Sequence, residues 1–113
     1  MKYTPKSEAK QHDNGPSCTV FEYTNDGEIG GAVGVINGRY PDQDYVLNTN
    51  SKEMFYVISG DGKLGTKSKV VALHPGDMAI MPSDEAYYLE GDNLQIFLAN
   101  TPPFDPTQHK AVK

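Results

Sequence analysis

Cysteine and tryptophan are almost absent from the sequence. Of its 113 residues only Cys18 is a cysteine, and none is a tryptophan. A single cysteine can form no intrachain disulfide and cannot supply a cysteine-rich zinc site, so neither kind of cross-link stabilises the fold. The fold must therefore depend on an apolar core, and we expect Cys18 to be a small buried side chain at the start of a strand.

Long apolar runs are also missing. No segment is apolar for long enough to cross a bilayer. Residues 1–17 are polar and contain nothing that resembles a signal peptide. We therefore expect a cytoplasmic protein that has no membrane partner.

Basic residues are few, because 10 Lys and Arg stand against 15 Asp and Glu and give a formal net charge of −5. No basic stripe is present that could follow a phosphate backbone, so we expect no nucleic-acid partner. Hydrophobic residues make up 37% of the chain. This content and the chain length suit one domain with a single core.

A helical period is absent, since no window keeps apolar residues 3.6 positions apart. Short alternating or apolar segments recur instead, punctuated by Gly, Pro and Asn. The expected strands are residues 18–23, 29–36, 43–47, 53–58, 63–66, 69–73, 78–81, 86–90 and 94–99. We expect a hairpin at Asn37 and Gly38, and a turn over residues 59–62. This pattern predicts an all-β sandwich or barrel.

The ends of the chain differ in composition from its centre. Residues 1–17 are polar and close on a Gly-Pro turn, which predicts a flexible N-terminal arm. Residues 102–113 are proline-rich at their start, which predicts an extended C-terminal tail. The predicted β-barrel therefore covers residues 18–101.

Two stretches of the sequence resemble the two motifs of the cupin superfamily. In the first, Gly38 precedes Glu53, and Gly60 follows the glutamate at the family's spacing. In the second, Gly76 and Pro82 keep the family's Gly-to-Pro spacing. The likeness covers roughly residues 30 to 100 and is nearest to small single-domain cupins of the type-2 or RmlC-like kind, which are often labelled mannose-6-phosphate-isomerase-like. It implies an all-β, double-stranded β-helix, the cupin jelly-roll barrel.

The sequence departs from that family at the metal ligands. Cupins hold a divalent metal with a His pair, a Glu and a later His. Depending on the spacing, the pair falls here on Val46 and Asn48 or on residues 47 and 49, and Tyr87 stands where the later His is expected. Only Glu53 remains, and one carboxylate does not hold a transition metal alone. We therefore expect no metal and no cofactor. The three histidines of the chain, His12, His74 and His109, are expected at the surface.

In the cupin register a small set of side chains points into the barrel. These are Val46, Asn48, Glu53, Phe55, Val57, Tyr87 and Leu89. An apolar cavity with a few polar groups is typical of small-molecule sites. Burial should raise the pKa of Glu53. Glu53, Tyr87 and Asn48 could equally satisfy one another within a closed core.

Four functions remain open at this point. The barrel could bind a small polar or carbohydrate-like molecule without metal, through Val46, Asn48, Phe55, Val57 and Leu89. It could be a sugar isomerase or epimerase with Glu53 and Tyr87 as catalytic acid and base. It could be a metal-dependent dioxygenase or lyase with non-standard ligands, or a non-catalytic interaction protein. A homodimer is expected in each case, because an exposed sheet edge or apolar face favours pairing.

Overall fold

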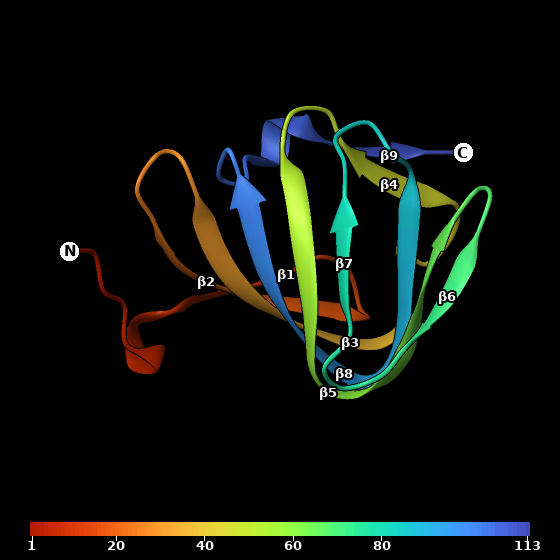
Figure 1. Cartoon of the computed structure of the whole chain (residues 1–113), viewed down its shortest axis with the longest axis horizontal. Helices are drawn as coiled ribbons and strands as arrows, with labels where there is room; N and C mark the ends of the chain where they lie inside the picture. The colour runs from red at the N-terminus through yellow and green to blue at the C-terminus, as the bar shows by residue number, and fades with distance from the viewer.

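A computed structural model describes all 113 residues and confirms the all-β jelly-roll barrel. Nine strands and two short 3-10 helices follow one another along the chain (Figure 1). Their bounds are η1 Lys6–Glu8, β1 Lys10–Asp13, β2 Cys18–Asn25, β3 Gly30–Tyr40, β4 Tyr45–Asn48, β5 Lys52–Thr66, β6 Val70–Leu73, β7 Met78–Met81, β8 Tyr87–Thr101, η2 Pro106–Gln108 and β9 His109–Val112.

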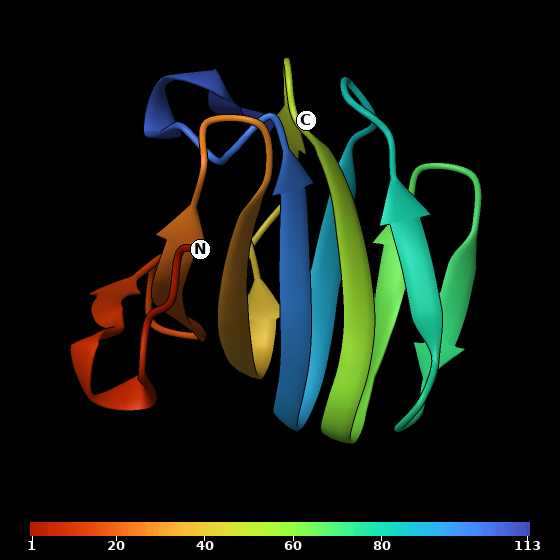
Figure 2. The same ribbon diagram turned by 60° about the vertical axis from the view of Figure 1, so that its left-hand side comes forward.

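The strands form two layers because the long strands β3, β5 and β8 bend and take part in both. In the first layer β1, β2 and β3 lie in order beside the second half of β8, which pairs with the first half of β5 and then β7. Figure 2 shows the strands of this layer side by side. In the second layer the first half of β8 pairs with the second half of β5, and β6, β4 and β9 complete it.

Side chains alternate between the inside and the outside of the barrel, as the period of a strand requires. On β5 Glu53, Phe55 and Val57 are buried, whereas Lys52, Tyr56 and Ile58 are exposed. The inward side chains of the two layers meet in one cluster of 14 buried residues. This core fills the barrel interior next to Glu53.

The turn predicted over residues 59–62 is wrong, because β5 continues through it. The pairing of β5 with β8 shifts register at Ser59 and again before Asp61, and the strand bends there into the second layer. Gly60 makes the bend possible: its φ is +82°, and a Cβ atom would collide with the carbonyl oxygen of Asn93. The hairpin predicted at residues 37–38 is likewise a bulge within β3.

Two strands lie in the terminal segments for which none was predicted. β1 pairs with β2 and extends the first layer, so residues 10–13 belong to the sheet. β9 pairs with β4, which brings the tail back to the barrel. No helix in the chain is long and apolar enough to span a membrane.

Candidate functional site

The centre of the candidate site is the carboxyl group of Glu53, near the start of β5. Glu53 is 6% exposed. The Tyr87 hydroxyl donates to its Oε1 over 3.0 Å, and the Asn100 amide Nδ2 donates to its Oε2 over 2.7 Å. Both donors come from β8, from opposite ends of the strand. Each carboxyl oxygen therefore accepts one hydrogen bond and keeps a further lone pair.

Burial controls the protonation of this group. It raises the pKa of Glu53, the hydrogen bonds from Asn100 and Tyr87 oppose that rise, and the nearby Glu22 carboxylate adds to it. Burial, with the charge of Glu53, also raises the pKa of Tyr87 well above its usual value. Tyr87 is thus a fixed hydrogen-bond donor, and Glu53 is the group that gains or loses a proton.

A second polar group lies in the same end of the barrel. The Tyr40 hydroxyl and His109 Nε2 are 2.6 Å apart, and His109 Nδ1 is 2.7 Å from Asn48 Oδ1. Since the Asn48 carbonyl oxygen only accepts, Nδ1 must carry the imidazole proton, and Nε2 accepts from Tyr40. Burial lowers the pKa of His109, so the imidazole is neutral near pH 7. Tyr40 and His109 form a hydrogen-bonded pair that can accept a proton.

The polar side chain of Gln108 holds His109 in place. Its Oε1 accepts from the backbone N–H groups of Asn50 and Ser51 over 2.8 and 2.7 Å. Its Nε2 donates to Ser51 Oγ, which in turn donates to the Pro102 carbonyl oxygen. The ring of Phe104 meets His109 edge-on, with centroids 5.5 Å apart. The C-terminal tail is therefore clamped to the β4–β5 connection, and it delivers the imidazole to the barrel.

Two hollows that share lining residues lie beside these groups. An inner cavity of about 40 Å³ is lined by Glu53, Tyr87, Tyr40 and His109 together with apolar core side chains. Such a volume holds a few water molecules and no larger ligand. An outer pocket of about 320 Å³ borders it, and Asn14, Tyr40 and His109 line both. Tyr40 and His109 are thus the wall between the buried carboxyl group and the outside.

The structure places all seven predicted inward side chains inside the barrel, but only some line the hollows. Glu53, Phe55, Tyr87 and Leu89 line the inner cavity, and Val46 lines the outer pocket. Asn48 reaches the site through His109, and Val57 is part of the packed core. The predicted contact of Asn48 with Glu53 is replaced by that of Asn100.

The sequence analysis does not select three members of the site. The expectation that His109 lies at the surface is wrong: the tail returns as β9, and the half-buried His109 lines the inner cavity. Tyr40 and Asn100 lie at strand ends, where the inward alternation could have selected them. His12 and His74 do lie at the surface, beside Glu22 and Asp77 respectively.

The side chains of this site do not fit the divalent metal that the cupin resemblance implies. Nowhere in the chain do three or more His, Cys, Asp or Glu side chains come together. The side chains hydrogen-bonded to Glu53 are one phenol and one carboxamide, and both oxygens of the carboxyl group already accept hydrogen bonds. Transition-metal sites require three or four imidazole, thiolate or carboxylate ligands.

Comparison with known proteins places the chain by its fold. No family profile and no curated protein sequence matches it. Among solved structures, Pac13 from Streptomyces, described as a unique nucleoside dehydratase, superposes with a TM-score of 0.85 and 19% identity over 100% of this chain and 91% of that one. Variants of Pac13 have been solved with uridine.

Two further structures have the same architecture. Ectoine synthase from P. lautus gives a TM-score of 0.80 at 16% identity, over 100% of this chain and 91% of that one. KdgF from Halomonas sp. gives 0.77 at 12% identity, over 95% and 98% of the two chains. At these identities the likeness concerns the fold.

Proposed function

We propose that this chain, which has the fold of a small single-domain cupin, binds a small polyhydroxylated molecule of the sugar or nucleoside class at the Glu53 end of its barrel. The protein then transfers a proton from one atom of the bound molecule to another. The observation that carries the proposal is the buried Glu53 carboxyl group, which shares a cavity with the neutral Tyr40–His109 pair. Two proton-accepting groups with opposite pKa shifts in one hollow are typical of acid–base sites.

The outer pocket is the place where such a molecule binds first. Its volume of about 320 Å³ lies within the range of small-molecule sites, which begins at roughly 300 Å³. Arg39, Asp42, Ser17 and Asn14 line it and offer hydrogen-bond donors and acceptors to hydroxyl groups. The bound molecule reaches Glu53 when the side chains of Tyr40 and His109 turn aside or make contact with it.

The proton transfer follows from the hydrogen bonds of the site. Tyr87 and Asn100 hold the carboxyl group of Glu53 with one lone pair free on each oxygen, so it can take a proton from a carbon next to a carbonyl group and return it to a neighbouring atom. On the other side, Tyr40 can take a hydroxyl proton while it passes its own to His109 Nε2. Such chemistry serves an isomerase, an epimerase or a dehydratase.

The similar fold of Pac13 supports this class of substrate, since that protein is a nucleoside dehydratase and has been solved with uridine. Ectoine synthase has the same barrel and, by its name, a different product, so the residues of the site, rather than the fold, carry the proposal.

Deuterium exchange tests the proposal directly. The protein is incubated in D2O with D-fructose, D-glucose, D-glucuronate and uridine, and loss of C–H signals or appearance of a product is followed by proton NMR. We expect exchange or conversion of at least one compound, and a fall of about 100-fold or more in the Glu53→Gln variant, with binding retained. Glu90→Gln is the matched control, because Glu90 lies in the surface and pairs with Lys63 at 3.2 Å. Undiminished turnover in Glu53→Gln would show that Glu53 is not the base.

A further inference from the structure

The only arginine of the chain, Arg39, lines the outer pocket, and its side chain is held in one position. Its Nη1 donates to the Pro41 carbonyl oxygen over 2.7 Å, and its Nη2 donates to the Asp44 carbonyl oxygen over 3.0 Å. The guanidinium carbon lies 4.1 Å from the centre of the Tyr88 ring. A side chain fixed in this way loses little further freedom when it binds a ligand.

The aromatic ring next to Arg39 is itself packed. Tyr88 on β8 is the register partner of Gly65 on β5, and a Cβ atom at Gly65 would collide with the ring. On its other side the ring of Tyr45 meets Tyr88 at 57°, with centroids 6.0 Å apart. The guanidinium group therefore lies on a fixed surface instead of extending freely into solvent.

The positive charge of Arg39 is not neutralised within the chain. The ion pairs of the protein involve His12, Lys63 and His74, and Arg39 takes part in none of them. Asp42, the only carboxylate in the pocket lining, is exposed. The two hydrogen bonds of Arg39 go to neutral carbonyl oxygens, so most of its N–H donors stay free.

Two neutral donors line the same pocket. They are the hydroxyl group of Ser17 and the side-chain amide of Asn14, and neither has a side-chain hydrogen bond within the chain. Gly38, which precedes Arg39, makes room for the hydroxyl group: its φ is +107°, and a Cβ atom there would lie 2.7 Å from Ser17 Oγ. The pocket thus combines one free cation with two free donors.

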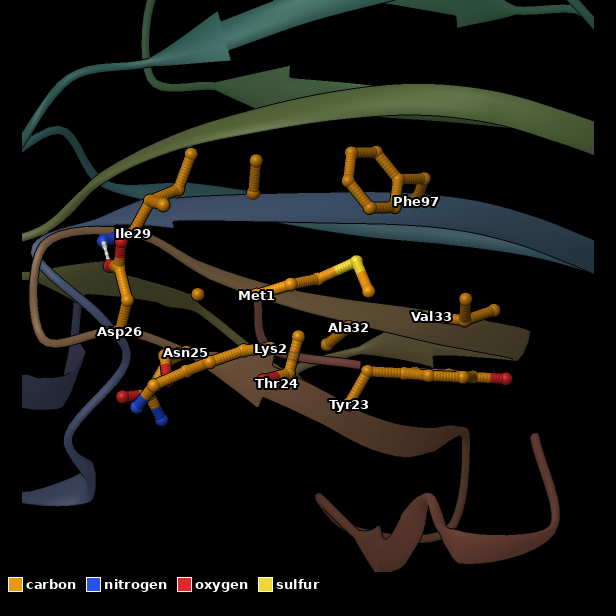
Figure 3. A pocket seen from close by; sticks show the side chains of 13 residues that line it. Met1, Lys2, Tyr23, Thr24, Asn25, Asp26, Ile29, Ala32, Val33 and Phe97 are labelled. Carbon is orange, nitrogen blue, oxygen red and sulfur yellow. Dashed lines mark hydrogen bonds between the residues drawn. The ribbon is translucent and has the colours of Figure 1, made fainter. Parts of the chain in front are cut away.

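A larger hollow, of about 740 Å³, lies on the outside of the first layer and lacks such free groups (Figure 3). Its lysine, Lys2, donates from Nζ to the Asn25 carbonyl oxygen over 3.1 Å. Its carboxylate, Asp26, accepts from the backbone N–H of Ile29 over 2.9 Å, as the dashed line in Figure 3 shows. Both charged side chains there are engaged, so the outer pocket suits a charged ligand better.

We propose that Arg39 is a specificity-determining residue, and that it binds an anionic oxygen group, a carboxylate or a phosphate, on the polyhydroxylated ligand. The planar guanidinium group matches two oxygens of such a group, and Ser17 and Asn14 donate to it as well. The anionic end stays in the outer pocket, and the hydroxylated end faces Tyr40 and His109. The inference rests on the proposed function, since it names the chemical class of that ligand.

Isothermal titration calorimetry with matched ligands tests the role of Arg39. D-glucose is compared with D-glucuronate and D-glucose 6-phosphate, and uridine with uridine 5′-monophosphate. In at least one series we expect an anion to bind about 30-fold or more tightly than its neutral counterpart, and Arg39→Gln to abolish the difference. Within the glucose series, the preferred anion distinguishes a carboxylate site from a phosphate site. Higher salt should weaken the anion and leave the neutral compound unaffected.

Lys67→Gln is the matched control, because it removes the same charge at another place. Lys67 Nζ lies 5.6 Å from the centre of the Tyr45 ring and lines a different hollow, so this variant should bind the anion as the wild type does. An equal loss in Lys67→Gln and Arg39→Gln would mean that net charge alone attracts the anion, and it would overturn the proposal.

A second variant guards against misfolding of Arg39→Gln, since that change also frees the carbonyl groups of Pro41 and Asp44. Ser17→Ala removes a hydroxyl group without a side-chain partner, so it should keep the circular dichroism spectrum and weaken the anion about tenfold. Unchanged binding in a folded Arg39→Gln, or in Ser17→Ala if the former does not fold, would overturn the proposal.

The outcome also separates this inference from the proposed function. Neutral compounds that bind as tightly as the anions and exchange C–H for deuterium would overturn the role of Arg39 and keep the proton transfer. Anion binding that depends on Arg39 without any exchange would support Arg39 and contradict the proton transfer. Absence of binding by every anion would overturn the proposal.

Discussion

Glu53 is a buried acid whose pKa is raised, so its effect on stability has a definite sign. Below its unfolded pKa, about 4.3, the carboxyl group is protonated in both states and costs nothing. As the pH rises toward the raised folded pKa, the unfolded state releases its proton first, and stability falls. The charged form of Glu53 is therefore the form that lowers the stability of the fold.

The stability of the Glu53→Gln variant should therefore depend less on pH between 4.5 and neutrality than that of the wild type, because Gln has no proton to release. The neutral amide keeps an acceptor for Tyr87, and Asn100 can turn its own amide to pair with the new group. Thermal unfolding at pH 4.5 and pH 7.5 is the measurement, and the melting temperature of Glu53→Gln should fall less over this interval than that of the wild type. An equal fall in both proteins would mean that Glu53 titrates as an exposed carboxyl group does.

At the scale of residues, the sequence predicts the inward side chains well and their partners poorly. Strand alternation puts Glu53 and Phe55 on one face, and the cupin register implies that this face and Tyr87 point inward. It does not predict that Asn100 rather than Asn48 meets the carboxyl group, since that depends on the register between β5 and β8. His109 lies outside any alternating segment, so no local signal marks it.

At the scale of elements, the long strands are built around their bends. The Gly-rich segment of residues 59–62 looks like a turn in sequence, and it is the place where β5 changes layer. Glycine with a positive φ is found both in tight turns and at bends within a strand. Only the pairing with β8 on either side of residues 59–62 shows that this segment is a bend. The short strands β1 and β9 are missed for a different reason, because their stability comes from β2 and β4 rather than from their own composition.

Gly60→Ala should destabilise the fold more than Gly15→Ala, although the two glycines have nearly equal φ values of +82° and +81°. A Cβ atom at Gly15 meets nothing within 4 Å, so its cost is the left-handed backbone alone, about 1 kcal/mol. At Gly60 the collision with the Asn93 carbonyl group adds strain, and we expect a total of about 3 kcal/mol. Urea unfolding of both variants measures the difference, and equal values would contradict a steric role for the bend.

At the scale of the whole molecule, one barrel offers two surfaces with different chemistry. The inside ends in a polar site near Glu53 with a small cavity, and uncharged side chains, among them Tyr56, Met78 and Ile80, stand on the outside of the first layer. The sequence predicts the barrel through its turn spacing and the cupin-like motifs. It does not predict how far the interior is filled, because that depends on how Leu89, Ile96 and Leu98 pack across the two layers.

The account depends most on the claim that the outer pocket, which Tyr40 and His109 share with the cavity at Glu53, is a ligand site. Amide and imidazole NMR spectra of the ¹⁵N-labelled protein, recorded while uridine, D-glucuronate and D-fructose are added in turn, test that claim. We predict that at least one compound shifts the signals of Tyr40, Glu53 and His109 and leaves those of Met78 and Ile80 unchanged. Shifts confined to Met78 and Ile80, or none with any compound, would contradict it.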